Sequence, residues 1–320
     1  MNFKNLPELL DYFKDEQTCR TYLENMRWEG VPECPYCKST GKMYRIEKGK
    51  RLKCGNKQCH KKFSVTVGTV FENTKIKLRL WFGALYLLTA HKKGISSLQL
   101  GRDLNVTQKT AWFILHRIRE MLRNDAPEML QGVVEIDEVY IGGKDKNKHA
   151  SKRSRVSEQK DPLRRGTENK GKVPVIGILQ RGGKVVTQKV RTTTADIVLP
   201  IIGKSVAAST TVITDAFPLY APLRDRYRHV VVDHSKGEYV KMKKFHTNTI
   251  EGFWSLLKRG IVGIYHQVSY KHLNKYTGEF AFRYNTREVT DCQRFNNALP
   301  LADGKRLTYK ELTHKFNFRG

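Results

Sequence analysis

The residues best suited to catalysis are three acids in apolar surroundings. Asp137 lies in the middle of VVEIDEVYIGG, Asp215 ends TTVITDA, and Glu251 flanks the apolar stripe of NTIEGFWSLLKRGI. A buried carboxylate is costly unless a cation or strong hydrogen-bond donors lie beside it. Carboxylate oxygens suit hard cations such as Mg²⁺ or Mn²⁺, and converging carboxylates are typical of two-metal phosphoryl transfer. The three acids are therefore candidates for a catalytic metal site if the fold brings them together.

Residues near these acids leave other interpretations open. An Asp at the end of a strand more often caps a turn or a helix, and Asp233 also ends an apolar strand. Strand alternation places Glu138 on the face opposite Asp137. Asn248 lies one helical turn before Glu251 and could ligate a metal, position DNA or cap the helix.

Four cysteines form a second candidate site. They are Cys34 and Cys37, separated by two residues, and Cys54 and Cys59, separated by four. Four thiolates complete the tetrahedral coordination of Zn²⁺ without an open position, which indicates a structural site. A redox dithiol would need only one pair, and His60 is the alternative to Cys59 as a ligand. The segment between the pairs alternates like a small hairpin, and a further strand is expected after it, as in a zinc ribbon.

Residues 95–122 are typical of a helix-turn-helix. Their apolar positions fit two helices joined by a tight turn at 104–107, and short polar residues open the second helix, at the end that would enter a major groove. Arg117, further along this helix, could reach phosphates. An ordinary helical hairpin is the alternative. The candidate DNA-contacting residues at the helix start are Thr107, Gln108, Lys109 and Thr110.

The elements that would position these residues change character near residue 132. Before it, residues up to about 30 favour one or two short helices, and residues 75–124 show three helical patterns. After it come three strands, a helix, a strand, a connection and a strand, and the chain is again helical from about 247. Trp254 belongs to the apolar stripe of that last region and is expected in the core.

The order of strands and acids resembles the RNase H-like catalytic domain of DDE transposases. The whole chain is similar to insertion-sequence transposases of the ISXO-like family, which join a zinc ribbon, a helical DNA-binding region and this domain. The resemblance implies an α/β fold with a mixed five-stranded sheet and flanking helices, preceded by a zinc ribbon and a helix-turn-helix. The strings that carry it are CPYC, CGNKQC, VEIDEVYIGGK, VITDAFPLY, HTNTIEGFWSLLKRGI and FRYNTR.

The resemblance also implies roles for individual residues. Asp137 and Asp215 would hold the catalytic Mg²⁺ or Mn²⁺. Glu251 is the expected third ligand, and Asn248 is the alternative, because family members can carry Asn where a carboxylate is expected. Lys258, with Arg259 beside it, would contact phosphates of the element ends, although a lysine near a helix C-terminus also suits the helix dipole in solvent.

The implied activity is that of a DNA transposase. It would cut double-stranded DNA at the ends of its element and join the 3′ ends to target DNA, at least as a homodimer on DNA. Two alternatives are a non-catalytic DNA-binding regulator derived from a transposase and an RNase H-like nuclease without a joining step.

The composition also indicates a polyanionic partner. The 320-residue chain carries 59 Lys and Arg against 31 Asp and Glu, a formal charge of +28, and 39% of its residues are hydrophobic. The hydrophobic content allows a packed core, which excludes a disordered basic tail, and nucleic acid best neutralises such a charge. An anionic membrane surface or a ribosomal neighbourhood would also fit. Residues 144–172 hold 11 Lys and Arg against 4 acids, a net +7, and favour a basic loop that is either a solvated linker or a clamp on a DNA strand.

The sequence suggests no membrane segment. The N-terminal residues lack the pattern of a secretory signal, and no stretch reaches the roughly 18 apolar residues of a membrane span. We therefore expect a cytoplasmic, nucleoid-associated bacterial protein. The expected regions are an N-terminal helical segment at 1–30, a zinc ribbon at 31–72, a helix-turn-helix region at 75–125, a catalytic domain at 130–300 and a tail at 301–320.

Overall fold

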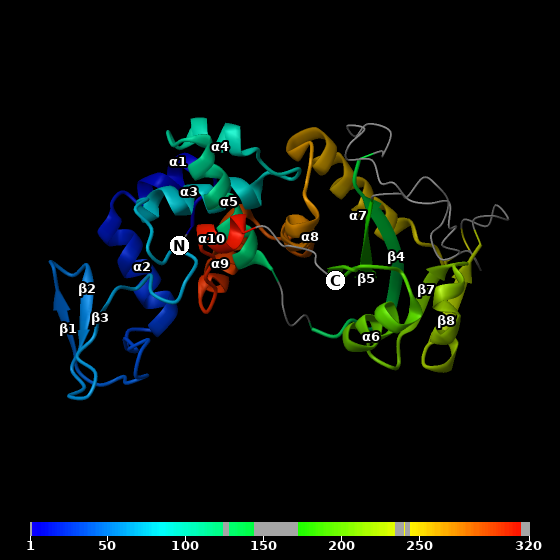
Figure 1. Ribbon diagram of the computed structural model, residues 1–320, viewed down its shortest axis with the longest axis horizontal. Coiled ribbons are helices and arrows are strands. Elements are labelled where there is room, and N and C mark those ends of the chain that lie inside the picture. Colours follow the sequence, from blue (N-terminus) through cyan, green and yellow to red (C-terminus); the bar gives the residue numbers. More distant parts are fainter. Residues whose placement is uncertain (1, 124–127, 144–171, 234–239, 241–243, 315–320) are drawn as a thin grey trace. The chain divides into compact units, whose positions relative to one another are not determined.

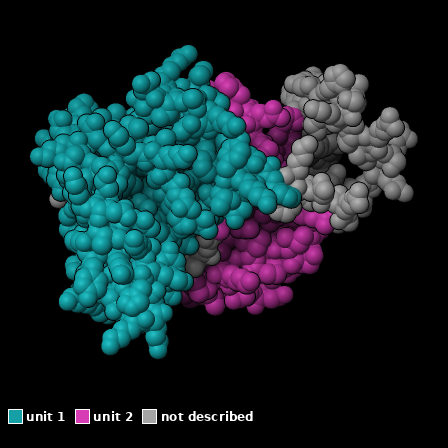
Figure 2. Space-filling view, turned by 60° about the vertical axis from the view of Figure 1, so that its left-hand side comes forward, with its two compact units in different colours: residues 1–122, 288–320 teal, residues 123–287 magenta. Residues whose placement is uncertain are grey.

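The computed structural model divides the chain into two compact units, drawn in different colours in Figure 2. The first unit comprises residues 1–122 and 288–320, and the second comprises residues 123–287. The expected basic loop at 144–172 lies almost entirely outside the described residues. Within the described part of the chain, no helix is long and apolar enough to cross a membrane. The described residues are 2–123, 128–143, 172–233, 240 and 244–314.

The first unit is built around the buried helix α3, and its last helices come from the C-terminal part of the chain (Figure 1). The ring of Phe295 in α9 packs against the rings of Phe3, Phe13 and Phe82. This packing returns the chain to the first unit after residue 287, earlier than the expected domain end at 300. The helices are α1 (Leu6–Tyr12), α2 (Glu16–Trp28), α3 (Leu78–Ala90), α4 (Ser97–Asp103), α5 (Gln108–Leu122), α9 (Asp291–Ala298) and α10 (Tyr309–Thr313).

The cysteine segment of the first unit forms a small antiparallel sheet in the order β1-β2-β3. The predicted hairpin is confirmed by the pairing of β1 (Met43–Ile46) with β2 (Arg51–Cys54). The strand expected after the second cysteine pair is shorter than the sequence suggested, because β3 (Lys62–Phe63) gives way to turns whose hydrogen bonds include Val67 N–H to the Ser64 carbonyl.

The second unit contains a five-stranded mixed sheet in the order β6-β5-β4-β7-β8. Strand β5 is antiparallel to both of its neighbours, β4 and β6, whereas β4, β7 and β8 run parallel to one another. This is the mixed five-stranded sheet with flanking helices that the sequence predicted. The elements are β4 (Val133–Ile141), β5 (Val173–Gln180), β6 (Val185–Lys189), α6 (Ala195–Ser205), β7 (Thr211–Asp215), β8 (Arg228–Val232), α7 (Asn248–Gly260) and α8 (Leu273–Asn285), with a 3-10 helix at Pro218–Asp225.

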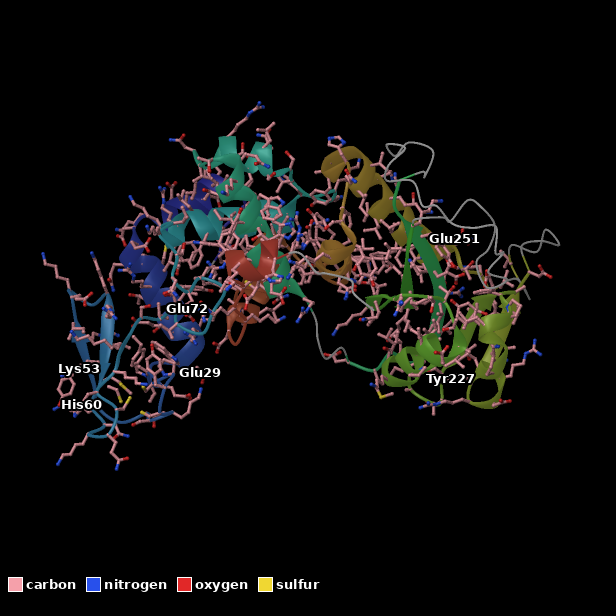
Figure 3. The ribbon with its side chains drawn as sticks, in the orientation of Figure 1. Glu29, Lys53, His60, Glu72, Tyr227 and Glu251 are labelled. Carbon is pink, nitrogen blue, oxygen red and sulfur yellow. The ribbon has the colours of Figure 1, made fainter. Side chains whose placement is uncertain are left out.

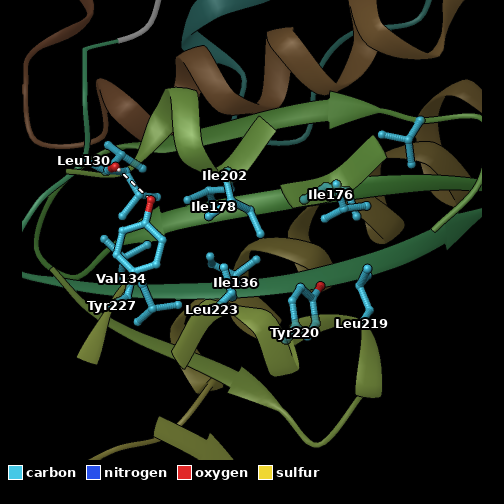
Figure 4. Packing of buried hydrophobic residues seen from close by; sticks show 14 residues of the cluster. Leu130, Val134, Ile136, Ile176, Ile178, Ile202, Leu219, Tyr220, Leu223 and Tyr227 are labelled. Carbon is cyan, nitrogen blue, oxygen red and sulfur yellow. Dashed lines mark hydrogen bonds between the residues drawn. The ribbon is translucent and has the colours of Figure 1, made fainter. Parts of the chain in front are cut away.

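The period-2 alternation of the central strand separates two apolar layers. Val134 and Ile136 face the layer that contains α6, where the Tyr227 hydroxyl donates to the Val206 carbonyl at 3.2 Å (Figure 4). Val139 faces the opposite layer, which contains α7 and α8. Odd-numbered residues of β4, including Asp137, therefore face α7.

Candidate active site and metal centres

Asp137 and Asp215 occupy equivalent levels of two neighbouring parallel strands. Glu135 of β4 pairs with Ile213 of β7, and each Asp lies two residues further along its strand. Asp215 is the last residue of β7, and its Oδ1 accepts the backbone N–H of Phe217 at 3.1 Å. The sheet therefore brings together the two acids that the sequence placed on its first and fourth strands.

Helix α7 supplies the third acid and a hydrogen bond to the first. The indole Nε1 of Trp254 donates to Asp137 Oδ2 at 3.1 Å. Glu251 lies one turn earlier on α7 (Figure 3), with an exposed side chain whose Oε1 accepts the Thr247 hydroxyl at 2.8 Å. Asn248, the first residue of α7, is also exposed. Both candidates for the third ligand thus belong to the first turn of the helix that contacts Asp137.

The pKa of Asp137 reflects the other acids near it. Burial, followed by the negative charges of Glu138, Asp215 and Glu251, raises the pKa of Asp137 to about 7. A divalent cation would offset this accumulation of negative charge, so the donor set fits a hard metal ion. Among the described residues, only the four cysteines bring three or more ligand atoms within 4.8 Å of one another. The three acids therefore do not form an equally tight cluster around a single point.

Glu138 lies on the other face of the sheet, as strand alternation predicted. Its Oε2 accepts the hydroxyl of Tyr220 at 2.8 Å, and Tyr220 belongs to the apolar layer of α6. Burial and the Glu138 carboxylate raise the pKa of Tyr220.

Two residues that support the site were not identified as such from the sequence. Trp254 is buried, as expected, and its indole also bonds to Asp137. Glu135 is fully buried and accepts hydrogen bonds from α7. The sequence spacing could have placed Glu135 on the same face as Asp137, because residues two apart on a strand share a face. No spacing rule indicates that the Trp254 indole would reach the sheet.

Gly177 makes that approach of the indole possible. It lies opposite Asp137 in the β4–β5 register, and a Cβ atom at this position would meet Trp254 Cζ2 at 2.4 Å. No side chain fits there without displacing the indole, which couples the packing of α7 to the orientation of Asp137.

The cysteine cluster has the dimensions of a zinc site. Cys34 Sγ lies 3.8 Å from Cys59 Sγ, and Cys37 Sγ lies 3.6 Å from Cys54 Sγ. A tetrahedron with Zn–S bonds of about 2.3 Å has sulfur–sulfur edges of about 3.8 Å. The four thiolates therefore fit a structural Zn²⁺, and the alternative ligand His60 (Figure 3) is exposed beside them.

Helices α4 and α5 form the tight turn expected of a helix-turn-helix. The Val106 N–H donates to the Gly101 carbonyl at 2.9 Å, and a Cβ on Gly101 would lie 3.0 Å from the Val106 carbonyl oxygen. At the start of α5 the side chains of Thr107, Gln108 and Lys109 are exposed. Thr110 is partly exposed.

Arg117 does not have the exposure that a phosphate contact requires, which corrects the expectation from its position on the helix. It is 4% exposed, its Nη2 donates to the Glu72 carbonyl at 2.8 Å, and its guanidinium lies 5.3 Å from the centre of the Trp81 ring. Burial lowers the pKa of Arg117 to about 10. Its helical phase turns it toward the unit's core, and hydrogen bonding and ring stacking keep it there. Lys258 and Arg259, in the last turn of α7, are exposed.

Two family models match the chain. The ISXO2-like transposase domain matches residues 129–285, and the transposase zinc-ribbon domain matches residues 14–62. An uncharacterized protein in transposable element ISH50 of Halobacterium salinarum is 33% identical over 288 residues, which are 87% of this chain and 92% of that protein.

Among solved structures, the Mos1 transposase paired-end complex with left transposon end has a TM-score of 0.28 at 15% identity, over 71% of this chain and 80% of that one. The Mos1 strand transfer complex has a TM-score of 0.29 at 16% identity, over 68% and 74%. The two domain matches and the ISH50 relative show that the chain belongs to the ISXO2-like transposase family, with a zinc ribbon ahead of its transposase domain.

Proposed function

We propose that this transposase cuts DNA at the ends of its insertion sequence and joins the freed 3′ ends to target DNA. The observation that carries the proposal is the placement of Asp137 and Asp215 at equivalent levels of neighbouring parallel strands, with Glu251 close enough to raise the pKa of Asp137. The mutual repulsion of these acids makes the site unfavourable until a cation is bound.

Asp137, Asp215 and Glu251 would hold two divalent ions, Mg²⁺ or Mn²⁺, with Asn248 as the alternative third ligand. When bound, such ions activate a water or 3′-hydroxyl nucleophile and stabilise the leaving oxygen. Trp254 keeps one oxygen of Asp137 oriented by its hydrogen bond. Because positioning and electrostatics carry phosphoryl transfer, the chain needs no covalent intermediate.

The DNA would be held by residues outside this acidic site. Lys258 and Arg259 are exposed cations on the helix that carries Glu251, and they suit the phosphates of the element ends. Thr107, Gln108, Lys109 and Thr110 would contact the major groove from the start of α5. Arg117 is left out of this set because it is buried. Cutting and joining two ends requires at least a homodimer on DNA.

The test is to incubate the purified protein with Mg²⁺, labelled element-end DNA and a target plasmid. We expect joined products that disappear in Asp137→Ala. Cut ends without joining would indicate a nuclease. Binding without cutting would indicate a DNA-binding regulator and contradict the enzymatic proposal.

A further inference from the structure

Glu135 is a fully buried acid on the face of β4 that carries Asp137. It lies two residues, about 7 Å, before Asp137 along the strand. Its Oε1 accepts hydrogen bonds from Arg181 Nε at 2.6 Å and Thr249 Oγ1 at 2.9 Å, and its Oε2 accepts the Ile250 backbone N–H at 2.9 Å. Both oxygens are therefore committed to donors of the chain itself.

The start of α7 is capped from the strand instead of by its own N-cap residue. An N-cap Thr commonly accepts the backbone N–H of the second or third helical residue. Thr247 is the N-cap but makes no such bond, and its hydroxyl donates to Glu251 Oε1 at 2.8 Å. Ile250 is the third residue, and Glu135 accepts its N–H. Glu135 thus takes the capping role, and the N-cap hydroxyl holds the Glu251 carboxylate.

Arg181 ties the segment that enters α7 to the same carboxylate. Its Nε donates to Glu135, its Nη1 donates to the Lys244 carbonyl at 2.7 Å, and its Nη2 donates to the His246 carbonyl at 2.7 Å. The planar guanidinium holds three groups at fixed angles, which a lysine cannot do. The guanidinium therefore joins the strand of Asp137 to the backbone just before the helix of Glu251.

We propose that Glu135 and Arg181 form an anchor that positions Glu251 for cation binding next to Asp137. Glu251 directly follows Ile250, whose N–H Glu135 accepts, so the separation of the two metal-binding acids is set through Glu135 on the Asp137 strand. The inference rests on the proposed function, because it takes Glu251 to be a metal ligand. Glu135 and Arg181 are positioning residues, and neither contacts the cation.

The test measures cation binding by the full-length protein without DNA. Terbium(III), which favours oxygen ligands, is excited through tryptophan, and Mg²⁺ or Mn²⁺ is then titrated as a competitor. Loss of the signal in Asp137→Asn and Trp254→Phe identifies the luminescence that comes from this site. In Glu135→Gln we expect the cation concentration at half-saturation to rise by about tenfold, as for other residues that orient metal ligands.

Two further variants keep the test decisive if Glu135→Gln folds poorly. Arg181→Lys retains the charge beside Glu135 but loses the carbonyl contacts, and Thr249→Val removes one donor to Oε1. Both should also raise the half-saturating concentration. Ile136→Val is the matched control, because it weakens packing on the same strand but faces the layer of α6, and it should leave cation binding unchanged.

Three results would be read against the proposal or its premise. Unchanged cation binding in Glu135→Gln and Arg181→Lys, with only a lower unfolding midpoint, would make the anchor merely structural. Weaker binding in Glu135→Gln alone would instead make Glu135 a ligand. Normal binding in Glu251→Gln would contradict the proposed ligand role of Glu251 itself and so identify a failure of the proposed function.

Discussion

The partly buried carboxylate of Asp137 links the stability of this protein to pH. Its pKa of about 7 in the folded protein exceeds the value of about 3.9 expected in an unfolded chain. Between these values the native state binds a proton that the unfolded state has lost. The contribution of Asp137 to stability is therefore full below pH 4 and falls as the pH rises to about 7 in the absence of metal.

Asp137→Asn should consequently stabilise the metal-free protein at pH 8, by an amount on the order of 2 kcal/mol. The gain should disappear below about pH 3, under both pKa values, where the wild-type carboxyl is protonated in both states. Denaturant unfolding at the two pH values measures the difference. If Asp137→Asn had the same free energy of unfolding as the wild type at pH 8, the ionised Asp137 carboxylate would not destabilise the metal-free protein, which would contradict this prediction.

Trp254→Phe should raise the pKa of Asp137 further. The indole N–H donates to Asp137 Oδ2, and a bond to the charged form lowers a carboxyl pKa, so its loss should raise the pKa by about one unit. NMR titration of the labelled aspartate carboxyl carbon in the metal-free protein measures this shift. A pKa that stays the same or falls in the variant would show that the bond does not favour the carboxylate.

At the scale of elements, the close approach of α7 to the sheet depends on Gly177. Gly177→Ala places a Cβ 2.4 Å from Trp254 Cζ2, so we expect a loss of about 2 kcal/mol in the free energy of unfolding. Gly252→Ala is the matched control. Gly252 is exposed on α7, and an added Cβ there would meet no neighbouring side chain or other element within 4 Å. That control should be neutral or stabilising by up to about 1 kcal/mol. Equal effects of the two substitutions would contradict the packing argument.

The zinc ribbon should depend on metal independently of the catalytic sheet. Cys54→Ser removes one of four thiolates, and we expect loss of bound zinc and rapid hydrogen exchange in β1–β3. Amides of β4–β8 should keep their protection, since these strands belong to the second unit. Metal analysis with hydrogen-exchange mass spectrometry measures both. Retained protection of the ribbon in a zinc-free protein would contradict the structural role.

The elements were more predictable from sequence than the contacts between them. Apolar alternation located the five strands of the sheet, and the hydrophobic stripes located α3, α5 and α7. The same stripes could not show that α9 returns to the first unit, because Phe295 meets Phe3 and Phe82 only after the chain has folded back. The burial of Arg117 could not be predicted for a related reason. Its charge favours an exposed side chain, whereas the fold provides buried partners in the Glu72 carbonyl and the Trp81 ring.

At the scale of the whole molecule, the catalytic unit is an insertion between two segments of the first unit. The net charge of +28 belongs to a chain whose reactive centre is acidic. This division suits the proposed function, because basic surfaces can hold the DNA backbone while Asp137, Asp215 and Glu251 would hold the cations that act on it. The family assignment and the placement of Asp137, Asp215 and Glu251 are independent observations, and both support the proposed transposase activity.

The most direct test of that claim compares two aspartates at the ends of adjacent parallel strands. Asp215 ends β7, and Asp233 follows β8 directly. In a Mg²⁺-dependent joining assay with element-end DNA, Asp215→Asn should lower the rate by about a thousandfold or more, as expected for loss of a metal ligand. Asp233→Asn should remain within about threefold of the wild-type rate, because Asp233 is not among the acids proposed to hold the cations. Normal joining by Asp215→Asn, or an equal loss in both variants, would contradict the assignment of the active site.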